Sequence, residues 1–267
     1  MFGAENLMVD IGGAKLPVAV FGKGKRNIIM LPGVGDGLHT VEGKALMLAL
    51  GYQGLCKEFR VFVMSRRVPF PEHQSTKEMA EDIKTVMDKL GIEKASFIGV
   101  SMGGMITQHF AASYPERTEK VILVVTTPGM TDEMNIIGDE WLKMAQNGDG
   151  VALMRSSVRN MYTDGYYKKN SWLCEVTGRF MMPKSYDRFI RMGFACIEHD
   201  ARPVLKDIKA PVLILGGEED RTVGAKASYE LYENIPGAKI KMYKGLRHAV
   251  YDESKEFGKD VLDFLNE

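Results

Sequence analysis

The sequence predicts an α/β protein built on a mostly parallel central sheet with helices on both faces. Short apolar runs alternate with helical patterns along most of the chain, and several runs are continuously apolar, as expected for strands buried on both faces. The alternation breaks between about residues 128 and 202, which look mostly helical. We therefore expect a core made of residues 1–127 and 203–267, with residues 128–202 inserted as a helical cap above the carboxyl ends of the strands.

The composition indicates one domain with a sizeable hydrophobic core. Of the 267 residues, 45% are hydrophobic, and 35 lysines and arginines balance 35 aspartates and glutamates. Because no polybasic run is present, neither nucleic acid nor an anionic membrane is expected as the principal partner. Three widely spaced cysteines favour reduced thiols. With no signal-peptide pattern and no apolar run near the ~20 residues that span a bilayer, we expect a cytoplasmic protein without a membrane span.

The first elements read as a hairpin followed by a buried strand. Leu7 to Ile11 and Leu16 to Phe21 are rich in strand-forming residues, and Gly12-Gly13 between them favours a tight turn. Arg26 to Leu31 predicts a strand that runs into a glycine-rich loop, whose backbone can approach a ligand closely. The next expected elements are a broadly helical stretch over residues 42–59 and a strand over residues 60–64.

Residues 76–90 carry the clearest helical signature before the cap. Thr76 is a candidate N-cap, apolar residues repeat on one face, and Gly91 is a candidate stop. A strand over residues 120–126 then precedes the cap. After the cap we expect a strand over residues 211–215, a helix over 225–234, a strand over 239–243 and a helix over 254–266.

The stretch from Lys94 to Met105 predicts an apolar strand, a sharp turn and an apolar helix, with Ser101 at the apex. Gly99 and Gly103 stand two residues on either side, where a tight turn leaves little room for a Cβ atom. Such a turn points the serine hydroxyl away from the sheet and leaves the Met102 amide free at the helix start, where it can stabilise a developing negative charge. The pattern is that of a G-x-S-x-G nucleophile elbow.

A serine nucleophile needs a general base, and five histidines are candidates. His248 follows the last strand, from where a loop can reach over the sheet to Ser101. His109 lies on a helix that runs away from Ser101 and is expected to be structural. His39 and His199 are candidates for a pocket wall, and His73 is expected to be solvated.

The base needs a carboxylate that orients it. Asp220 follows the expected strand over residues 211–215, and its strand end is where such a group should come from. Glu218 and Glu219 stand in the same turn and remain alternatives on spacing alone. The resulting chain order is nucleophile, acid, base, with Ser101, Asp220 and His248.

These residues give the chain a resemblance to α/β-hydrolase-fold enzymes over essentially its whole length. The resemblance rests on Gly99-Val100-Ser101-Met102-Gly103-Gly104, on Gly217-Glu218-Glu219-Asp220 and on His248. In that family the acid typically ends a G-x-x-D turn, which favours Asp220. The family forms half of its oxyanion hole after the third strand, which corresponds here to Leu31-Pro32-Gly33-Val34. The resemblance therefore implies an oxyanion hole made by the backbone amides of Val34 and Met102.

One loop departs from the family pattern. Many relatives carry a glycine-bearing loop after the fourth strand, whereas this chain has Ser65-Arg66-Arg67-Val68-Pro69-Phe70, in which only Arg67 corresponds. The elbow and cap are similar to those of carboxylesterases, 3-oxoadipate enol-lactonases and carbon–carbon bond hydrolases alike. Haloalkane dehalogenases and epoxide hydrolases of this fold use an aspartate at the apex, so Ser101 argues against both.

The sequence thus predicts a serine hydrolase that acts on a small or medium ester, lactone or related acyl substrate. We expect no metal and no cofactor, because metal-ligand clusters and nucleotide-binding glycine motifs are missing. The alternatives are a carbon–carbon bond hydrolase and a ligand receptor with an intact triad and slow turnover. The methionines of the cap either form an adaptable apolar acyl pocket or only fill core, and Arg66 and Arg67 are candidates for the entrance. The oligomeric state is left open.

Overall fold

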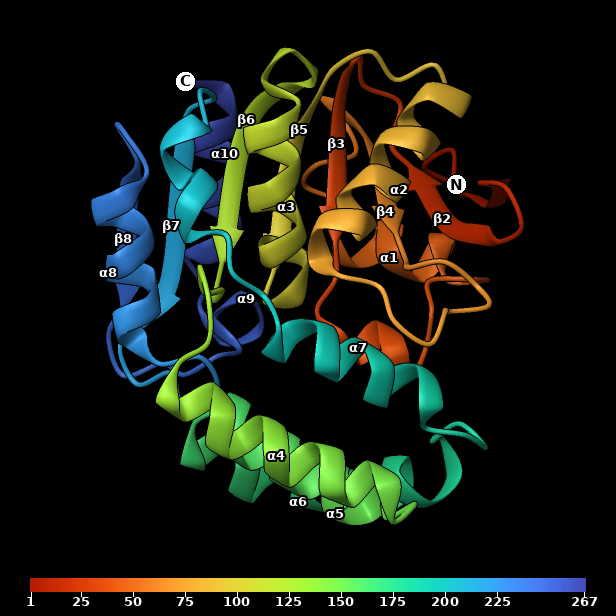
Figure 1. Cartoon of the computed structure of the whole chain (residues 1–267), viewed down its shortest axis with the longest axis vertical. Coiled ribbons are helices and arrows are strands. Elements are labelled where there is room, and N and C mark those ends of the chain that lie inside the picture. Colours follow the sequence, from red (N-terminus) through yellow and green to blue (C-terminus); the bar gives the residue numbers. More distant parts are fainter.

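A computed structural model describes all 267 residues of the chain. An eight-stranded sheet runs through its centre in the order β1-β2-β4-β3-β5-β6-β7-β8 (Figure 1). The pairs β1–β2 and β2–β4 are antiparallel, and all other neighbours are parallel. The fold class predicted from the sequence is confirmed. The strands are β1 (Glu5–Asp10), β2 (Lys15–Phe21), β3 (Arg26–Leu31), β4 (Phe59–Met64), β5 (Ala95–Val100), β6 (Thr118–Val124), β7 (Val212–Gly217) and β8 (Lys239–Tyr243).

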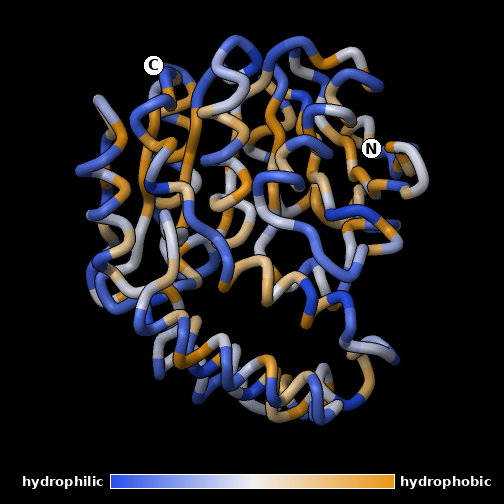
Figure 2. The backbone as a smooth tube through the Cα atoms, viewed as in Figure 1, coloured by the Kyte–Doolittle hydropathy of each residue, from blue (hydrophilic) through white to orange (hydrophobic).

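Alternate residues of the central strands face opposite helical layers. In β3, Ile28 and Met30 pack with α1 (Ala45–Gly51) and α10 (Phe257–Asn266), whereas Ile29 and Leu31 pack with helices of the other face. This alternation follows from the two-residue repeat of a strand. Figure 2 shows the result, with hydrophobic strands inside and hydrophilic residues along the outer helices. The helices of the other face are α2 (Thr76–Lys89), α3 (Met102–Ser113) and α8 (Ala225–Asn234).

A helical segment separates β6 from β7 and lies beyond the carboxyl ends of the strands (Figure 1). We call residues 128–202 the cap segment; its standing as a separate domain stays a prediction. Its helices enclose a small core of their own, made by Trp141, Ala145, Leu153 and Phe189. The helices are α4 (Asp132–Gln146), α5 (Gly150–Met161), α6 (Asp164–Phe180) and α7 (Asp187–Ile197).

Two local predictions were wrong. The helix expected over residues 42–59 is confined to α1, and turns follow it up to β4. The N-cap of α2 is Ser75 rather than Thr76, because Ser75 and Glu78 bond each other's backbone amides in a capping box. The Thr76 hydroxyl instead lies 2.9 Å from Nδ1 of His199. Short turns η1 (Val34–Gly37), η2 (Pro115–Arg117) and η3 (Arg202–Asp207) and the short helix α9 (Val250–Glu253) complete the chain.

None of the helices combines the length and the apolar character that crossing a membrane would require.

Candidate active site

Ser101 forms the turn between β5 and α3, with backbone angles φ 54° and ψ −120°. A positive φ is strained for a serine, and such strain concentrates at functional turns. The glycines on either side make this turn possible. A Cβ on Gly103 would lie 1.9 Å from the Leu31 carbonyl oxygen, and one on Gly99 would lie 2.6 Å from the Gly103 carbonyl oxygen. Both positions therefore require glycine, and β3 and α3 together hold Ser101 in place.

His248 and Asp220 form a buried pair between two loops at the carboxyl ends of β7 and β8. Nδ1 of His248 lies 2.8 Å from Oδ2 of Asp220, and each side chain is only 3% exposed. The other carboxylate oxygen of Asp220 accepts hydrogen bonds from the backbone amides of Thr222 at 2.8 Å and Val223 at 3.1 Å. These bonds fix the carboxylate, so the imidazole ring beside it has one favoured orientation.

The pair also favours one tautomer of His248. A carboxylate can only accept hydrogen bonds, so the proton belongs on Nδ1 and leaves Nε2 as a potential base. The competing acids of the same turn point elsewhere: Glu218 and Glu219 are both exposed to solvent. Of the three candidate acids, the structure brings only Asp220 to His248.

Ser101 and His248 line one cavity of about 420 Å³ between the core and the cap segment. Their side chains make no hydrogen bond to each other, and such bonds often tighten only when a substrate is bound. The cavity wall contains no lysine or arginine. The cap segment contributes Trp141, Met154, Ser157, Val158, Met161, Tyr162 and Phe189 to it.

The backbone amides proposed for an oxyanion hole both begin helical turns. Val34 is the first residue of η1 and Met102 is the first residue of α3, and amides at such positions have no acceptor within their own helix. The η1 loop passes close to Ser101, since a Cβ on Gly33 would lie 3.3 Å from the Ser101 Cβ. The two amides therefore belong to segments that meet at Ser101.

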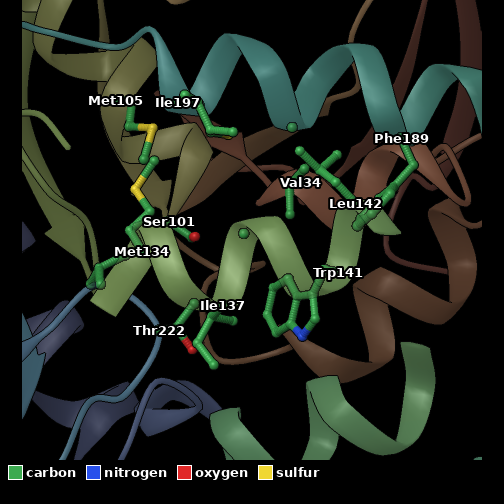
Figure 3. Close-up of a pocket in the computed structure, with 14 residues that line it drawn as sticks. Val34, Ser101, Met105, Met134, Ile137, Trp141, Leu142, Phe189, Ile197 and Thr222 are labelled. Atoms are coloured by element: carbon green, nitrogen blue, oxygen red, sulfur yellow. The ribbon is translucent and has the colours of Figure 1, made fainter. Parts of the chain in front are cut away.

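A second, smaller lobe of about 60 Å³ also opens at Ser101. Figure 3 shows Met105 of α3 on one side of this lobe, with residues of α4 and α7 around it. Its wall is almost entirely apolar, and His248 does not belong to it. Two methionines of the cap segment line the larger lobe and Met134 lines the smaller one, whereas Met192 is fully buried in the core. The cap methionines thus serve both of the roles considered from the sequence.

Sequence reasoning missed a buried charge cluster beside η1. The side chain of Asp36 is fully buried, and its carboxylate accepts hydrogen bonds from the Ser65 hydroxyl and from the Arg66 amide at 2.9 Å. Arg188 of α7 reaches across from the cap segment and donates to the same carboxylate at 2.7 Å. Arg188 also donates to the backbone oxygens of Asp36 and Arg66. This cluster ties the cap segment to the loop that carries Val34.

The suggestion that Arg66 and Arg67 approach the entrance was wrong. Arg66 is 1% exposed, and its guanidinium donates to the backbone oxygens of Pro32 at 2.6 Å and Met64 at 3.1 Å. Burial lowers the pKa of Arg66 to about 10. Arg67 instead pairs with Asp82 of α2. Both arginines stabilise the loop after β4, and neither lines the cavity.

Of the four other histidines, only one lines the cavity. His39 is exposed and lines the larger lobe. His199 is buried against His109, with the two rings edge to face and their centroids 5.2 Å apart. Burial and the neighbouring His109 lower the pKa of His199 to about 3. His73 is exposed and pairs with Glu198, so His39 alone of these four faces the cavity.

The fold and the serine turn define an α/β hydrolase. The chain belongs to the family described as serine aminopeptidase, S33, whose model matches residues 70–255. The matched span contains Ser101, Asp220 and His248.

Comparisons with individual proteins place the chain among hydrolases. It is 28% identical over 254 residues to a 2-hydroxy-6-oxo-6-phenylhexa-2,4-dienoate hydrolase of Burkholderia cepacia, with 89% of this chain and 87% of that protein covered. Its fold is similar to that of an alpha/beta hydrolase enzyme from a Medee basin deep-sea metagenome library, with a TM-score of 0.86, 22% identity and 98% of each chain covered. It is also similar to the enol-lactonase from Burkholderia xenovorans, with a TM-score of 0.83, 23% identity, and 98% and 100% of the chains covered.

Proposed function

We propose that this chain is a serine hydrolase that cleaves a small or medium carboxylic ester, lactone or related acyl substrate. The observation that carries the proposal is that a strained Ser101 and the buried pair of His248 and Asp220 meet in one cavity, because Ser101 and His248 both line its wall. This is the set of groups that nucleophilic acyl transfer requires: a nucleophile, a base and an orienting acid.

The reaction would proceed in two steps. Ser101 Oγ attacks the carbonyl carbon while Nε2 of His248 takes its proton, and the leaving oxygen takes that proton as its bond to the carbonyl carbon breaks. Water then attacks the acyl-enzyme, with His248 again accepting a proton and returning it to Ser101. Asp220 holds the ring and stabilises the imidazolium in both steps. The amides of Val34 and Met102 would bind the oxyanion, and each such donor contributes on the order of 3 kcal/mol in comparable sites.

The two lobes suggest how the substrate lies. The leaving group must lie near His248, which lines only the larger lobe. The acyl chain would therefore occupy the smaller apolar lobe, whose volume of about 60 Å³ suits a short chain. Neither lobe has a lysine or arginine in its wall, and the guanidinium of Arg188 on α7 is engaged by Asp36. A neutral substrate is thus favoured over an anionic one.

A carbon–carbon bond hydrolase is the second candidate, and one specific observation favours it. The Burkholderia cepacia relative is named for a dienoate that has a ketone and a carboxylate but no ester, so its hydrolysis must break a carbon–carbon bond. The same nucleophile, base and oxyanion donors serve such a reaction. The lack of a free cation in the cavity argues against an anionic dienoate as the substrate of this chain.

A fluorophosphonate probe followed by a substrate panel tests the proposal. The probe should add a single label, at Ser101, and Ser101→Ala should abolish it. The panel compares p-nitrophenyl acetate and butyrate with a 2-hydroxy-6-oxo dienoate, whose loss is followed by its absorbance. Steady turnover of the esters alone supports the proposal, and preferential turnover of the dienoate supports the second candidate. Labelling that persists at the same rate in Ser101→Ala would refute both, and a single turnover without release would indicate a receptor.

A further inference from the structure

The outward side of α6 exposes large apolar side chains at helical spacing. Trp172 is 63% exposed, Val176 is 42% exposed and Phe180 is 76% exposed, and these three residues stand four positions apart. Residues at this spacing share one side of a helix. Leu173, 37% exposed, stands next to them. We call this side of α6, with the charged residues described next, the α6 face.

The same face carries cations but no free acid. Lys168, Lys169 and Arg179 are exposed and form no salt bridge. The acidic residues of α6 are engaged elsewhere: Asp164 accepts from Arg247 at 2.9 Å, and Glu175 pairs with Arg155 of α5. The α6 face is therefore both apolar and positively charged, although the formal net charge of the chain is zero.

The α6 face points to solvent, and the opposite side of α6 packs against the rest of the cap segment. Gly178 lies so close to α5 that a Cβ on it would be 2.5 Å from the Val151 Cα, and Cys174 is buried on the same side. α5 in turn lines the larger lobe of the cavity. α6 thus packs with one side on α5, a helix that forms part of the cavity wall, and exposes its other side.

The charge pattern decides between the possible occupants. A second copy of the chain, docked through the same face, would place lysines and arginine against lysines and arginine with no acid between them, which is unfavourable. An anionic lipid surface offers a hydrocarbon boundary for the apolar residues and phosphate groups for the cations. Trp172 and Phe180 are side chains that such interfacial helices use on their apolar side.

We propose that the α6 face docks the protein onto anionic lipid surfaces. The docking is peripheral, because one helical face enters the headgroup region and the rest of the chain stays outside. It does not depend on the proposed chemistry at Ser101. If that chemistry also holds, docking brings the cavity close to a phase in which neutral apolar esters concentrate.

Tryptophan fluorescence offers a direct test on the unmodified protein. The chain has two tryptophans, and Trp141 is only 8% exposed, so a spectral shift on binding would report on Trp172. We expect a blue shift and co-sedimentation with vesicles of phosphatidylcholine and phosphatidylglycerol, and much weaker binding to phosphatidylcholine alone. The binding should weaken as salt is added. Trp172→Phe should remove the shift but keep most of the co-sedimentation.

Two variants and a matched control identify the surface. Val176→Asp should abolish vesicle binding, and Lys168→Glu with Lys169→Glu should weaken it by roughly fivefold or more for each cation replaced. Ile136→Asp changes an equally exposed apolar residue, 67% exposed on α4, and should bind like the unmodified chain. Vesicle binding that Val176→Asp leaves intact would overturn the proposal. So would a dimer in light scattering that Val176→Asp dissociates in the absence of vesicle binding, since that result assigns the face to a second copy.

Discussion

At the scale of single residues, the candidate site depends on a few positions that tolerate no ordinary side chain. A non-glycine residue at positive φ costs on the order of 1–3 kcal/mol, and Ser101 keeps this conformation because the surrounding backbone leaves no alternative. Gly103 packs directly against the Leu31 carbonyl, so any side chain there would push the start of α3 away from β3 and disturb the turn. The strained Ser101 thus lies beside the loop that leads into η1, at the place where a carbonyl substrate would be held.

Asp220→Asn tests the role of the acid. The amide keeps the shape of the carboxylate and can still accept from the Thr222 amide, but its NH₂ group would donate to His248 Nδ1 and favour the wrong tautomer. We expect kcat for an ester to fall by about 10⁴-fold with little change in melting temperature. Glu219→Gln, in the same turn but exposed, serves as the control and should retain activity. A damaging Glu219→Gln beside a near-normal Asp220→Asn would show that the acid is misassigned.

His199 should make the free energy of unfolding depend on pH, independently of the candidate active site. Its pKa is lowered to about 3, first by burial and then by His109, whereas an unfolded histidine titrates near 6.5. The unfolded chain therefore binds more protons between these values, and the free energy of unfolding must fall as the pH drops from about 6.5 towards 3. We expect a loss of a few kcal/mol by about pH 4 from this residue.

Urea unfolding between neutral and acidic pH measures this effect. His199→Gln, which cannot gain a proton, should show a flatter decline of stability with falling pH, although it starts from a lower value. His73→Gln removes an exposed histidine and should decline as the unmodified chain does. If the free energy of unfolding falls with pH equally steeply in His199→Gln and in the unmodified chain, other groups cause the loss of stability in acid.

At the scale of elements, α7 connects the cap segment to the η1 turn of the core, which carries one of the proposed oxyanion-hole amides. Its Arg188 donates to the Asp36 carboxylate and backbone within η1, the turn that also carries Val34. Gly37 of η1 lies directly under the helix, since a Cβ there would be 2.6 Å from the Phe189 Cα. The position of the Val34 amide therefore depends on how α7 packs against the core.

Arg188→Met tests this coupling. The substitution keeps much of the aliphatic bulk but leaves the buried Asp36 carboxylate without its guanidinium, which costs about 3 kcal/mol of unfolding free energy in comparable pairs. We expect lower stability in urea and a fall in kcat that exceeds the rise in KM, because the oxyanion loop is displaced. Arg191→Met lies on the same helix, where Arg191 donates only to the Phe70 carbonyl, and should be much milder. If both variants behave alike, α7 merely packs and does not position η1.

Elements with local signals were predictable, and contacts between distant elements were not. The strands, the hairpin and the serine turn were predictable because apolar runs and glycine pairs act within a few residues. The pairing of Asp36 with Arg188 spans 152 positions and has no local pattern to reveal it. The helix expected over residues 42–59 was too long, because Gly51 and Gly54 stand within it and the chain forms turns after α1. The cations of the α6 face share one helix with Trp172, so helical spacing places them on one side, and only the fold shows that this side is exposed.

At the scale of the whole molecule, the cavity lies between a core that carries the proposed catalytic residues and a cap segment that supplies much of the wall. Ser101, Asp220 and His248 come from loops at the carboxyl edge of the sheet, while the smaller lobe is closed by α4 and α7. Binding energy from parts of a substrate remote from the reacting carbon can raise transition-state affinity. We therefore expect substitutions in the cap segment to change which substrate is preferred, with the chemistry left intact.

Gly138→Val in α4 tests whether the cap segment sets substrate preference without affecting the chemistry. Gly138 lines the smaller lobe, and it shares a helix side with Met134, Trp141 and Leu142, which also line it. A Cβ on Gly138 meets nothing within 4 Å, so valine should extend into open space and shorten the lobe without a clash. Losing the fit of one methylene costs about 1–3 kcal/mol, so kcat/KM for a butyrate ester should fall about tenfold or more relative to an acetate ester.

Labelling by a small fluorophosphonate should stay near normal in Gly138→Val, because such labelling depends on the proposed triad and oxyanion hole rather than on the smaller lobe. Asn135→Val places the same side chain on an exposed position of α4 and controls for the helix itself. Melting curves for both variants must show folded protein before the kinetics are compared. An unchanged ratio of butyrate to acetate turnover in folded Gly138→Val would mean that the acyl chain does not enter this lobe, and the acyl site would then have to lie in the larger lobe beside η1.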